Sequence, residues 1–166
     1  MKIKDLVKRS QFFVLSSKKI FVFIQSLKEK FPKKISDIPV DSDEYLARFI
    51  IFSKWIRNSD KRVKPDAFIP HPHEELSVTR HLYPNNLSEE ELWAIGQDVA
   101  NSRSTTLYGR ADILTMIVRQ QNLDVIPKQV KGNPNHANVV NWPNNKPLQK
   151  IIAQKLAADA QYFPKP

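Results

Sequence analysis

Hydrophobic and polar residues follow strand-like patterns over the first part of residues 45–166. Aromatic and β-branched residues crowd residues 45–56, which predicts a strand. A polar turn at residues 57–61 then predicts that residues 62–69 pair back on this strand as a hairpin. Pro65 limits the second strand of the hairpin to a sheet edge or a short ladder.

The clearest helical signal begins at Ser88. Ser88 and Glu91 have the spacing of a capping box, in which each side chain bonds the backbone N–H of the other residue. Leu87 can pack on Leu92 across the start of the helix as a hydrophobic staple. The pattern therefore predicts a helix that begins after Ser88 and ends near Asn101.

The remaining elements are shorter. Asp112 is expected to cap a short helix over residues 113–121, although the same apolar run is compatible with a buried strand. The other predictions are strands over residues 76–82, 123–126 and 137–142, and a last helix with an apolar stripe at Leu148, Ile151, Ile152 and Leu156. Together they predict an α+β fold: a small, mainly antiparallel sheet with two to three helices packed on one face.

Charge separates residues 1–34 from the rest of the chain. The whole chain has a net charge of +9, but residues 35–166 are close to neutral. Residues 20–31 carry apolar side chains at helical spacing among lysines, which predicts a basic amphipathic helix that ends before Pro32. The cations of this segment, expected to bind nucleic acid, are Lys2, Lys4, Lys8, Arg9, Lys18, Lys19, Lys28, Lys30, Lys33 and Lys34.

The predicted organisation is a basic arm at residues 1–34, a linker at 35–44 and one α+β domain at 45–166. The linker is inferred from Pro39 and the acidic residues around it. Three interpretations of the arm stay open: a helix packed on the domain, a free arm, or the product of a mis-assigned start codon. Residues 1–34 lack the cleavage pattern of a secretory signal, so a cytoplasmic location is expected.

Composition excludes several kinds of chemistry. The chain has no cysteine, which rules out disulfides, thiol nucleophiles and Cys-type zinc sites. It also lacks the phosphate-binding GxxxxGK[ST] loop, the dinucleotide GxGxxG turn, and the HExxH and GxSxG motifs. No run of 18 apolar residues is present to cross a bilayer.

Four residues could form a catalytic pocket. His136 lies between asparagines at the start of a predicted strand, where an imidazole can act as a general acid or base near neutral pH. Arg110 follows Gly109 and precedes the predicted helix, a position that suits a bound anion. His81 and Arg80 are adjacent on a predicted strand and point to opposite faces, so only one of them can join such a pocket.

Metal binding is not expected. His71, His73 and Glu74 are metal-ligand types, but a proline-flanked extended segment does not hold residues two apart on one face. A surface connection between two strands is the simpler interpretation of this segment. No cofactor is therefore predicted.

Three functions follow from these patterns. The first is a small basic binding module that associates with nucleic acid, or with a complex that contains it, through weak and salt-sensitive contacts of the arm. The second is a small metal-independent enzyme that acts on phosphodiester or nucleotide substrates with the His/Arg pocket. The third is a scaffold or interaction protein attached to an anionic membrane surface, with a protein as its partner.

Overall fold

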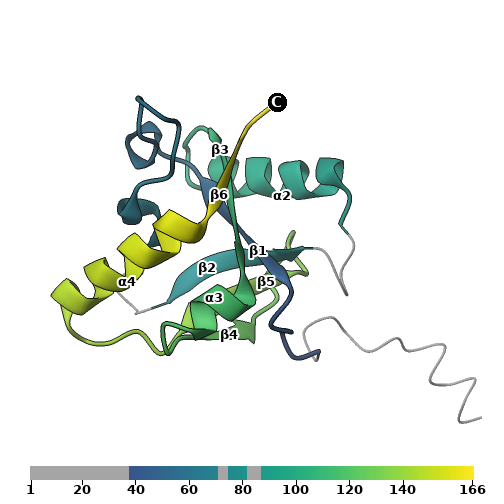
Figure 1. The fold of residues 1–166 in the computed structure, drawn as a ribbon. Helices are drawn as coiled ribbons and strands as arrows, with labels where there is room; N and C mark the ends of the chain where they lie inside the picture. The colour runs from purple at the N-terminus through teal and green to yellow at the C-terminus, as the bar shows by residue number, and fades with distance from the viewer. Residues whose placement is uncertain (1–37, 71–74, 82–86) are drawn as a thin grey trace, which may run out of the picture. The chain divides into compact units, whose positions relative to one another are not determined.

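A computed structural model of the chain describes residues 38–70, 75–81 and 87–166 (Figure 1). The amphipathic helix predicted within residues 1–34 lies outside these residues, and so do His71, His73 and Glu74. None of the helices in the described residues is long and apolar enough to cross a membrane.

The described residues form a six-stranded sheet in which every neighbouring pair of strands is antiparallel. The strand order is β4-β5-β2-β1-β3-β6. The strands are β1 (Tyr45–Ile50), β2 (Leu76–His81), β3 (Gly109–Leu114), β4 (Asp124–Pro127), β5 (His136–Val140) and β6 (Gln161–Pro164). Three α-helices accompany the sheet: α2 (Glu89–Ser102), α3 (Thr115–Arg119) and α4 (Lys146–Asp159). The predicted α+β class is confirmed.

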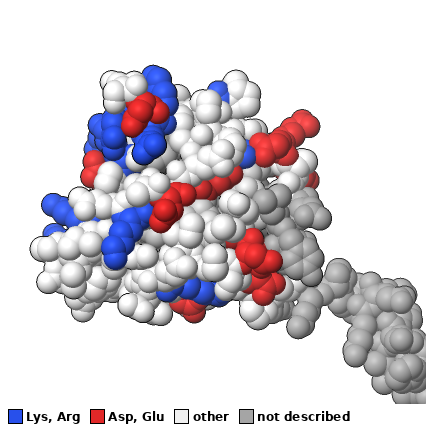
Figure 2. Space-filling view, in the orientation of Figure 1, with Lys and Arg blue, Asp and Glu red and all other residues white. Residues whose placement is uncertain are grey.

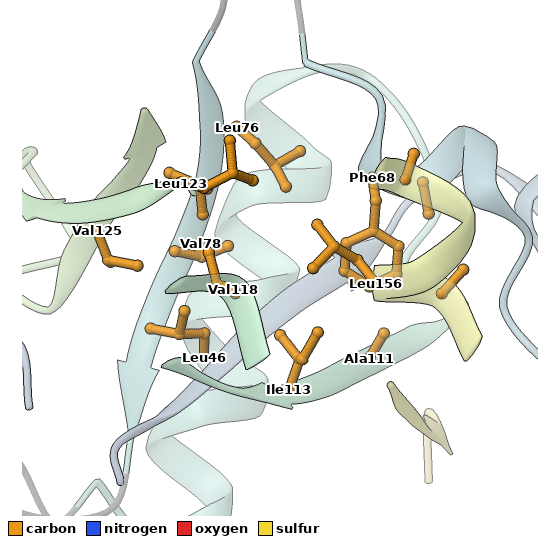
Figure 3. Close-up of a cluster of buried hydrophobic side chains, with 14 of the residues drawn as sticks. Leu46, Phe68, Leu76, Val78, Ala111, Ile113, Val118, Leu123, Val125 and Leu156 are labelled. Atoms are coloured by element: carbon orange, nitrogen blue, oxygen red, sulfur yellow. The ribbon is translucent and has the colours of Figure 1, made fainter. Parts of the chain in front are cut away.

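The helices cover both faces of the sheet, and the prediction of a single covered face is wrong. Leu46 and Ile50 of β1 join a core with Val118 of α3 and Leu156 of α4 (Figure 3). Ala47, Phe49 and Ile51, which alternate with them, pack on Leu92 and Ile95 of α2 in a second cluster. Since successive side chains of a strand point to opposite faces, β1 must be apolar on both.

The predicted start of α2 is confirmed in detail. Ser88 Oγ accepts a hydrogen bond from the backbone N–H of Glu91, and the Glu91 carboxylate accepts one from the N–H of Ser88. Leu92 belongs to the second core cluster, and the partly buried Leu87 packs against that cluster. The capping box needs contacts only across one turn of helix, which explains why the sequence alone predicts it.

The hairpin predicted after β1 is reduced to a turn and one bridge. Arg57 N–H donates to Arg62 O across the turn, and Ile56 pairs with Val63. Two 3₁₀ helices, η2 (Ser53–Trp55) and η3 (Pro65–Phe68), replace the longer strands that were expected. Pro65 has no N–H to donate to a ladder and instead begins η3.

The helix predicted after Asp112 starts later than expected. Asp112 lies within β3, opposite Ala47 of β1 and Gln161 of β6. Only the start of the apolar run, Ile113 and Leu114, extends the strand β3 between β1 and β6. The rest of the run forms the predicted helix, which as α3 begins only at Thr115. Strand β6 was not predicted. It can approach β3 because Gly109 has no side chain: a Cβ there would lie 2.5 Å from Phe163 O.

Residues 38–44, assigned to a linker from composition, pack closely against the sheet. Val40 belongs to the main core, and the Glu44 side chain is fully buried. The carbonyls of Ile38 and Pro39 accept hydrogen bonds from Arg80. This short segment is therefore part of the fold that it precedes.

Candidate anion-binding site

Arg80 is a structural residue. Its guanidinium donates to both carboxylate oxygens of Glu44, at 2.8 and 2.7 Å, and both side chains are fully buried. It points to the face of the sheet that holds Leu46, whereas His81 points to the face of Tyr45. Arg80 is therefore closed off from any ligand.

Arg110 and His81 lie together in a second buried network. The Arg110 guanidinium donates to Glu89 at 2.6 and 2.8 Å and to Asp112 at 3.1 and 3.2 Å. It lies between the rings of Trp93 and Phe163, 4.7 Å from each centroid. Burial opposes its charge, but the hydrogen bonds to Glu89 and the charge of Asp112 outweigh this and raise the pKa of Arg110. His81 Nε2 lies 3.3 Å from Asp112 Oδ2 without forming a hydrogen bond.

His136 does not meet Arg110. Two strands, β2 and β1, separate β5 from β3, which places the two backbones about 14 Å apart. The donors of Arg110 face Glu89 and Asp112, whereas His136 lines a different pocket, which β1, β2 and the end of α2 border and which Arg110 does not line. The structure does not bring His136, Arg110, His81 and Arg80 into one pocket, and it gives no support to an enzyme built on those four.

The described residues contain no group of three His, Asp or Glu side chains that could hold a metal ion.

A different arginine organises the best candidate site. Arg48, in β1, is 8% exposed. The pairing of β1 with β2 ends at Ala47, and beyond that point Arg48 Nη1 donates to Ser77 O at 3.0 Å. Its Nε donates to Ala67 O at 2.9 Å, and its guanidinium carbon lies 5.3 Å from the centroid of a Trp55 ring.

Arg48 has no carboxylate partner among the residues that the structure describes. Burial, and to a smaller extent repulsion from Arg103, lowers the pKa of Arg48 to about 10. Arg48 is therefore still a cation at neutral pH. A buried cation that is bonded only to carbonyls is stabilised by an added anion, because no carboxylate is paired with it. Arg48 therefore creates a site that favours a negative ligand.

The loop after β1 presents more cations beside Arg48. The N–H of Lys64 donates to Trp55 O at 2.7 Å, and Lys61 has a φ of 56° at the turn. These contacts close residues 54–64 into a compact loop with five cations and one carboxylate, Asp60. Figure 2 shows Lys and Arg atoms gathered over this loop at the upper left.

A cavity of about 740 Å³ lies between this loop and the start of α4. We call it the Trp55 cavity. Lys54, Lys146 and Lys150 border it, and within the described part of the chain none of them forms an ion pair. Its other lining residues are Arg48, Trp55, Asp66, Ile69, Pro70, Asn144 and Gln149.

The Trp55 cavity joins four cations and one carboxylate to an aromatic wall. Trp55 is half-buried, its ring braced by the edge of Phe52 at 4.8 Å and by the Arg48 guanidinium. The start of α4 is capped by the Asn145 side chain, which fixes Lys146 and Lys150 on the border of the cavity. Such a site can hold phosphate oxygens on its cations and a flat ring against Trp55.

Sequence reasoning missed this site. Residues 35–166 are almost neutral as a whole, and that average conceals the local excess of cations at residues 54–64. A charge count in short windows would have found the loop. Nothing in the sequence indicates that Lys146 and Lys150 lie beside it, because that proximity depends on the packing of α4 against η3.

Comparison with protein-family models, with curated proteins and with solved structures finds no match to this chain.

Proposed function

We propose that this protein is a nucleic-acid-binding module whose folded body holds a single strand at the Trp55 cavity. The observation that carries the proposal is the cavity itself, with four cations around a half-buried tryptophan. Proteins that bind single strands combine a positive groove for the phosphates with aromatic rings on which bases stack. The volume of about 740 Å³ is within the range of sites that hold small organic groups, so a nucleotide unit fits.

The arm at residues 1–34 adds attraction without sequence preference. Its ten cations against two carboxylates favour any polyanion, and engagement of about half of them with phosphates gives a log–log salt slope of roughly −3 to −4. The body then selects single strands over duplexes, because only an unpaired base can reach the Trp55 ring.

Fluorescence anisotropy with a labelled single-stranded oligonucleotide, over a series of KCl concentrations, tests the proposal. The full chain is compared with a triple variant, Lys54→Gln, Lys146→Gln and Lys150→Gln. Each phosphate contact of a single strand contributes about −0.7 to the slope, so the triple variant should have a slope smaller in magnitude by up to about 2. Quenching of Trp fluorescence on binding should be lost in Trp55→Phe.

The matched control is a second triple variant, Lys131→Gln, Lys155→Gln and Lys165→Gln. These lysines are exposed and do not line the Trp55 cavity, and the two triple variants have the same net charge. Equal slopes for the two variants would overturn the role of the cavity. Binding to anionic lipid vesicles without binding to the oligonucleotide would overturn nucleic acid as the partner and favour the membrane alternative.

A further inference from the structure

A second, smaller pocket lies next to Arg48, and we call it the Arg103 pocket. Its volume is about 30 Å³, room for about two water molecules or one small oxyanion. Arg48 lines both this pocket and the Trp55 cavity. Arg103, His136, Asn133, Ser77 and Thr79 complete its polar lining.

Two guanidinium groups face this pocket and no carboxylate lines it. Arg103 is the C-cap residue of α2, where its backbone N–H donates to the carbonyls of Ala100 and Asn101. Its side chain makes no hydrogen bond or ion pair with any described residue. Arg103 is near enough to Arg48 for its charge to lower the pKa of Arg48. Two unneutralised cations side by side repel each other, and an oxyanion between them removes that repulsion.

His136 supplies the third polar wall. Its Nδ1 lies 2.6 Å from Lys128 O, and because a carbonyl can only accept, Nδ1 carries the proton. In the neutral ring Nε2 then has a free lone pair, which can accept a hydrogen bond from a protonated phosphate oxygen. Burial, and after it the charge of Lys128, lowers the pKa of His136 against the opposing effects of the Lys128 carbonyl and of Glu75.

The remaining polar groups of the pocket are held in place. Asn133 Nδ2 donates to Thr79 Oγ1 at 2.7 Å, and Asn133 Oδ1 accepts from the N–H of Asn135 at 3.1 Å. Ser77 O accepts from Arg48 and so fixes the guanidinium at the pocket. The site is preorganised, because ligand binding has to order only the Arg103 side chain.

We propose that the Arg103 pocket binds one phosphate group, between the guanidiniums of Arg48 and Arg103 and against the imidazole of His136. The phosphate is either free phosphate or the terminal phosphate of a nucleotide chain. The Arg103 pocket shares Arg48 with the Trp55 cavity but contains none of its lysines and not Trp55, so the two sites can be tested separately.

A titration of the full chain with inorganic phosphate tests this proposal. The titration is monitored by NMR of the histidine side chains, with chloride holding the ionic strength constant. The signal of His136 is assigned with a His136→Gln variant, and its chemical shift should change with phosphate concentration until it reaches a plateau. The pKa of His136 should rise, because the bound anion favours the protonated imidazole. Arg103→Gln should weaken phosphate binding at least about tenfold, since it removes a charge-assisted contact. Arg103 is exposed, so this variant is expected to fold normally.

Arg62→Gln is the matched control, because Arg62 is also exposed and does not line the pocket. A shift of His136 that does not saturate, or equal phosphate affinity in Arg103→Gln and wild type, would overturn the proposal. Arg62→Gln weakening phosphate binding as much as Arg103→Gln would do the same, because the effect would then follow net charge alone.

Oligonucleotides with and without a 5′-phosphate distinguish the two sources. Tighter binding of the phosphorylated strand, lost in Arg103→Gln but kept in the triple lysine variant of the Trp55 cavity, assigns the pocket to a strand end. Equal binding of the two strands, together with saturable binding of inorganic phosphate, assigns it to free phosphate. Saturable phosphate binding without any oligonucleotide binding would refute the proposed function and leave the phosphate pocket standing.

Discussion

Arg80 and Glu44 form an ion pair with 2.7 Å between Nη2 and Oε1 and no exposed surface on either side chain. The two residues are 36 positions apart, on β2 and at the end of the segment that leads into β1. Glu44 also accepts a hydrogen bond from the N–H of Asp41, and Arg80 binds the carbonyls of Ile38 and Pro39. The pair thus attaches residues 38–44 to the sheet.

Breaking this pair should destabilise the fold strongly. Arg80→Met leaves the Glu44 carboxylate buried without its cation, and we expect a loss of about 3 to 5 kcal/mol in the free energy of unfolding. The double variant Arg80→Met with Glu44→Leu should lose clearly less than the sum of the two single variants, because no charge is then stranded. Urea unfolding of the four proteins measures this. Arg57→Met, which breaks the exposed Arg57–Asp60 pair, is the control and should change stability by less than about 1 kcal/mol.

Gly96→Ala in α2 should be destabilising although alanine favours helices. The substitution gains about 1 kcal/mol of helix propensity. A Cβ at this position would lie 2.7 Å from the ring of Phe49, which is 6% exposed and packed on the sheet. Overpacking of this kind costs about 1 to 3 kcal/mol, so a net loss is expected in thermal or urea unfolding. Ala94→Gly, on the exposed side of α2, is the control and measures the effect of helix propensity alone. A Gly96→Ala protein that is more stable than wild type would contradict the close packing of α2 on Phe49.

Glu89 should make stability depend on pH in the acid range. Its hydrogen bonds to Arg110 lower its pKa below the usual 4.5, against a smaller opposing effect of burial. The unfolded chain then binds more protons than the folded one, so the stabilisation is complete above about pH 4.5 and is lost as pH falls through the lowered pKa. Glu89→Gln should flatten the dependence of the unfolding free energy on pH below 4.5. Glu90→Gln removes the neighbouring carboxylate, which forms no ion pair with a described residue, and should leave that dependence on pH steeper than in Glu89→Gln.

The position at which the chain is shortened should decide whether the fold survives. A chain that begins at Ile35 keeps every contact of residues 38–44, and we expect cooperative unfolding with little change in midpoint. A chain that begins at Asp41 lacks the buried Val40 side chain and the two carbonyls that bind Arg80, and it should lose at least about 3 kcal/mol. Equal stability of the two chains would mean that residues 38–40 contribute nothing.

Several elements could be predicted from the sequence because their causes are local. The capping box of Ser88 and Glu91 lies within one helical turn. Strand β2 follows from its alternating residues, and the turn at residues 57–61 from its polar composition. In each of these the deciding interactions join residues a few positions apart, so a short window of sequence contains all the information. The excess of cations at residues 1–34 is likewise a property of composition alone.

Tertiary structure decided the candidate site. The pattern around Asp112 fits a capped helix or a strand, and only the pairing of β3 with β1 and β6 selects the strand. Arg110 and His136 both looked suited to a ligand, yet Glu89 and Asp112 neutralise Arg110, and His136 lies on β5, which two strands separate from β3. The cation that matters, Arg48, looks like an ordinary strand residue in the sequence. Its partners Ala67 and Ser77 are 19 and 29 positions away in the sequence. Their carbonyls reach the Arg48 guanidinium only through the register of the sheet and the packing of the loop, and neither of these brings a carboxylate partner to it.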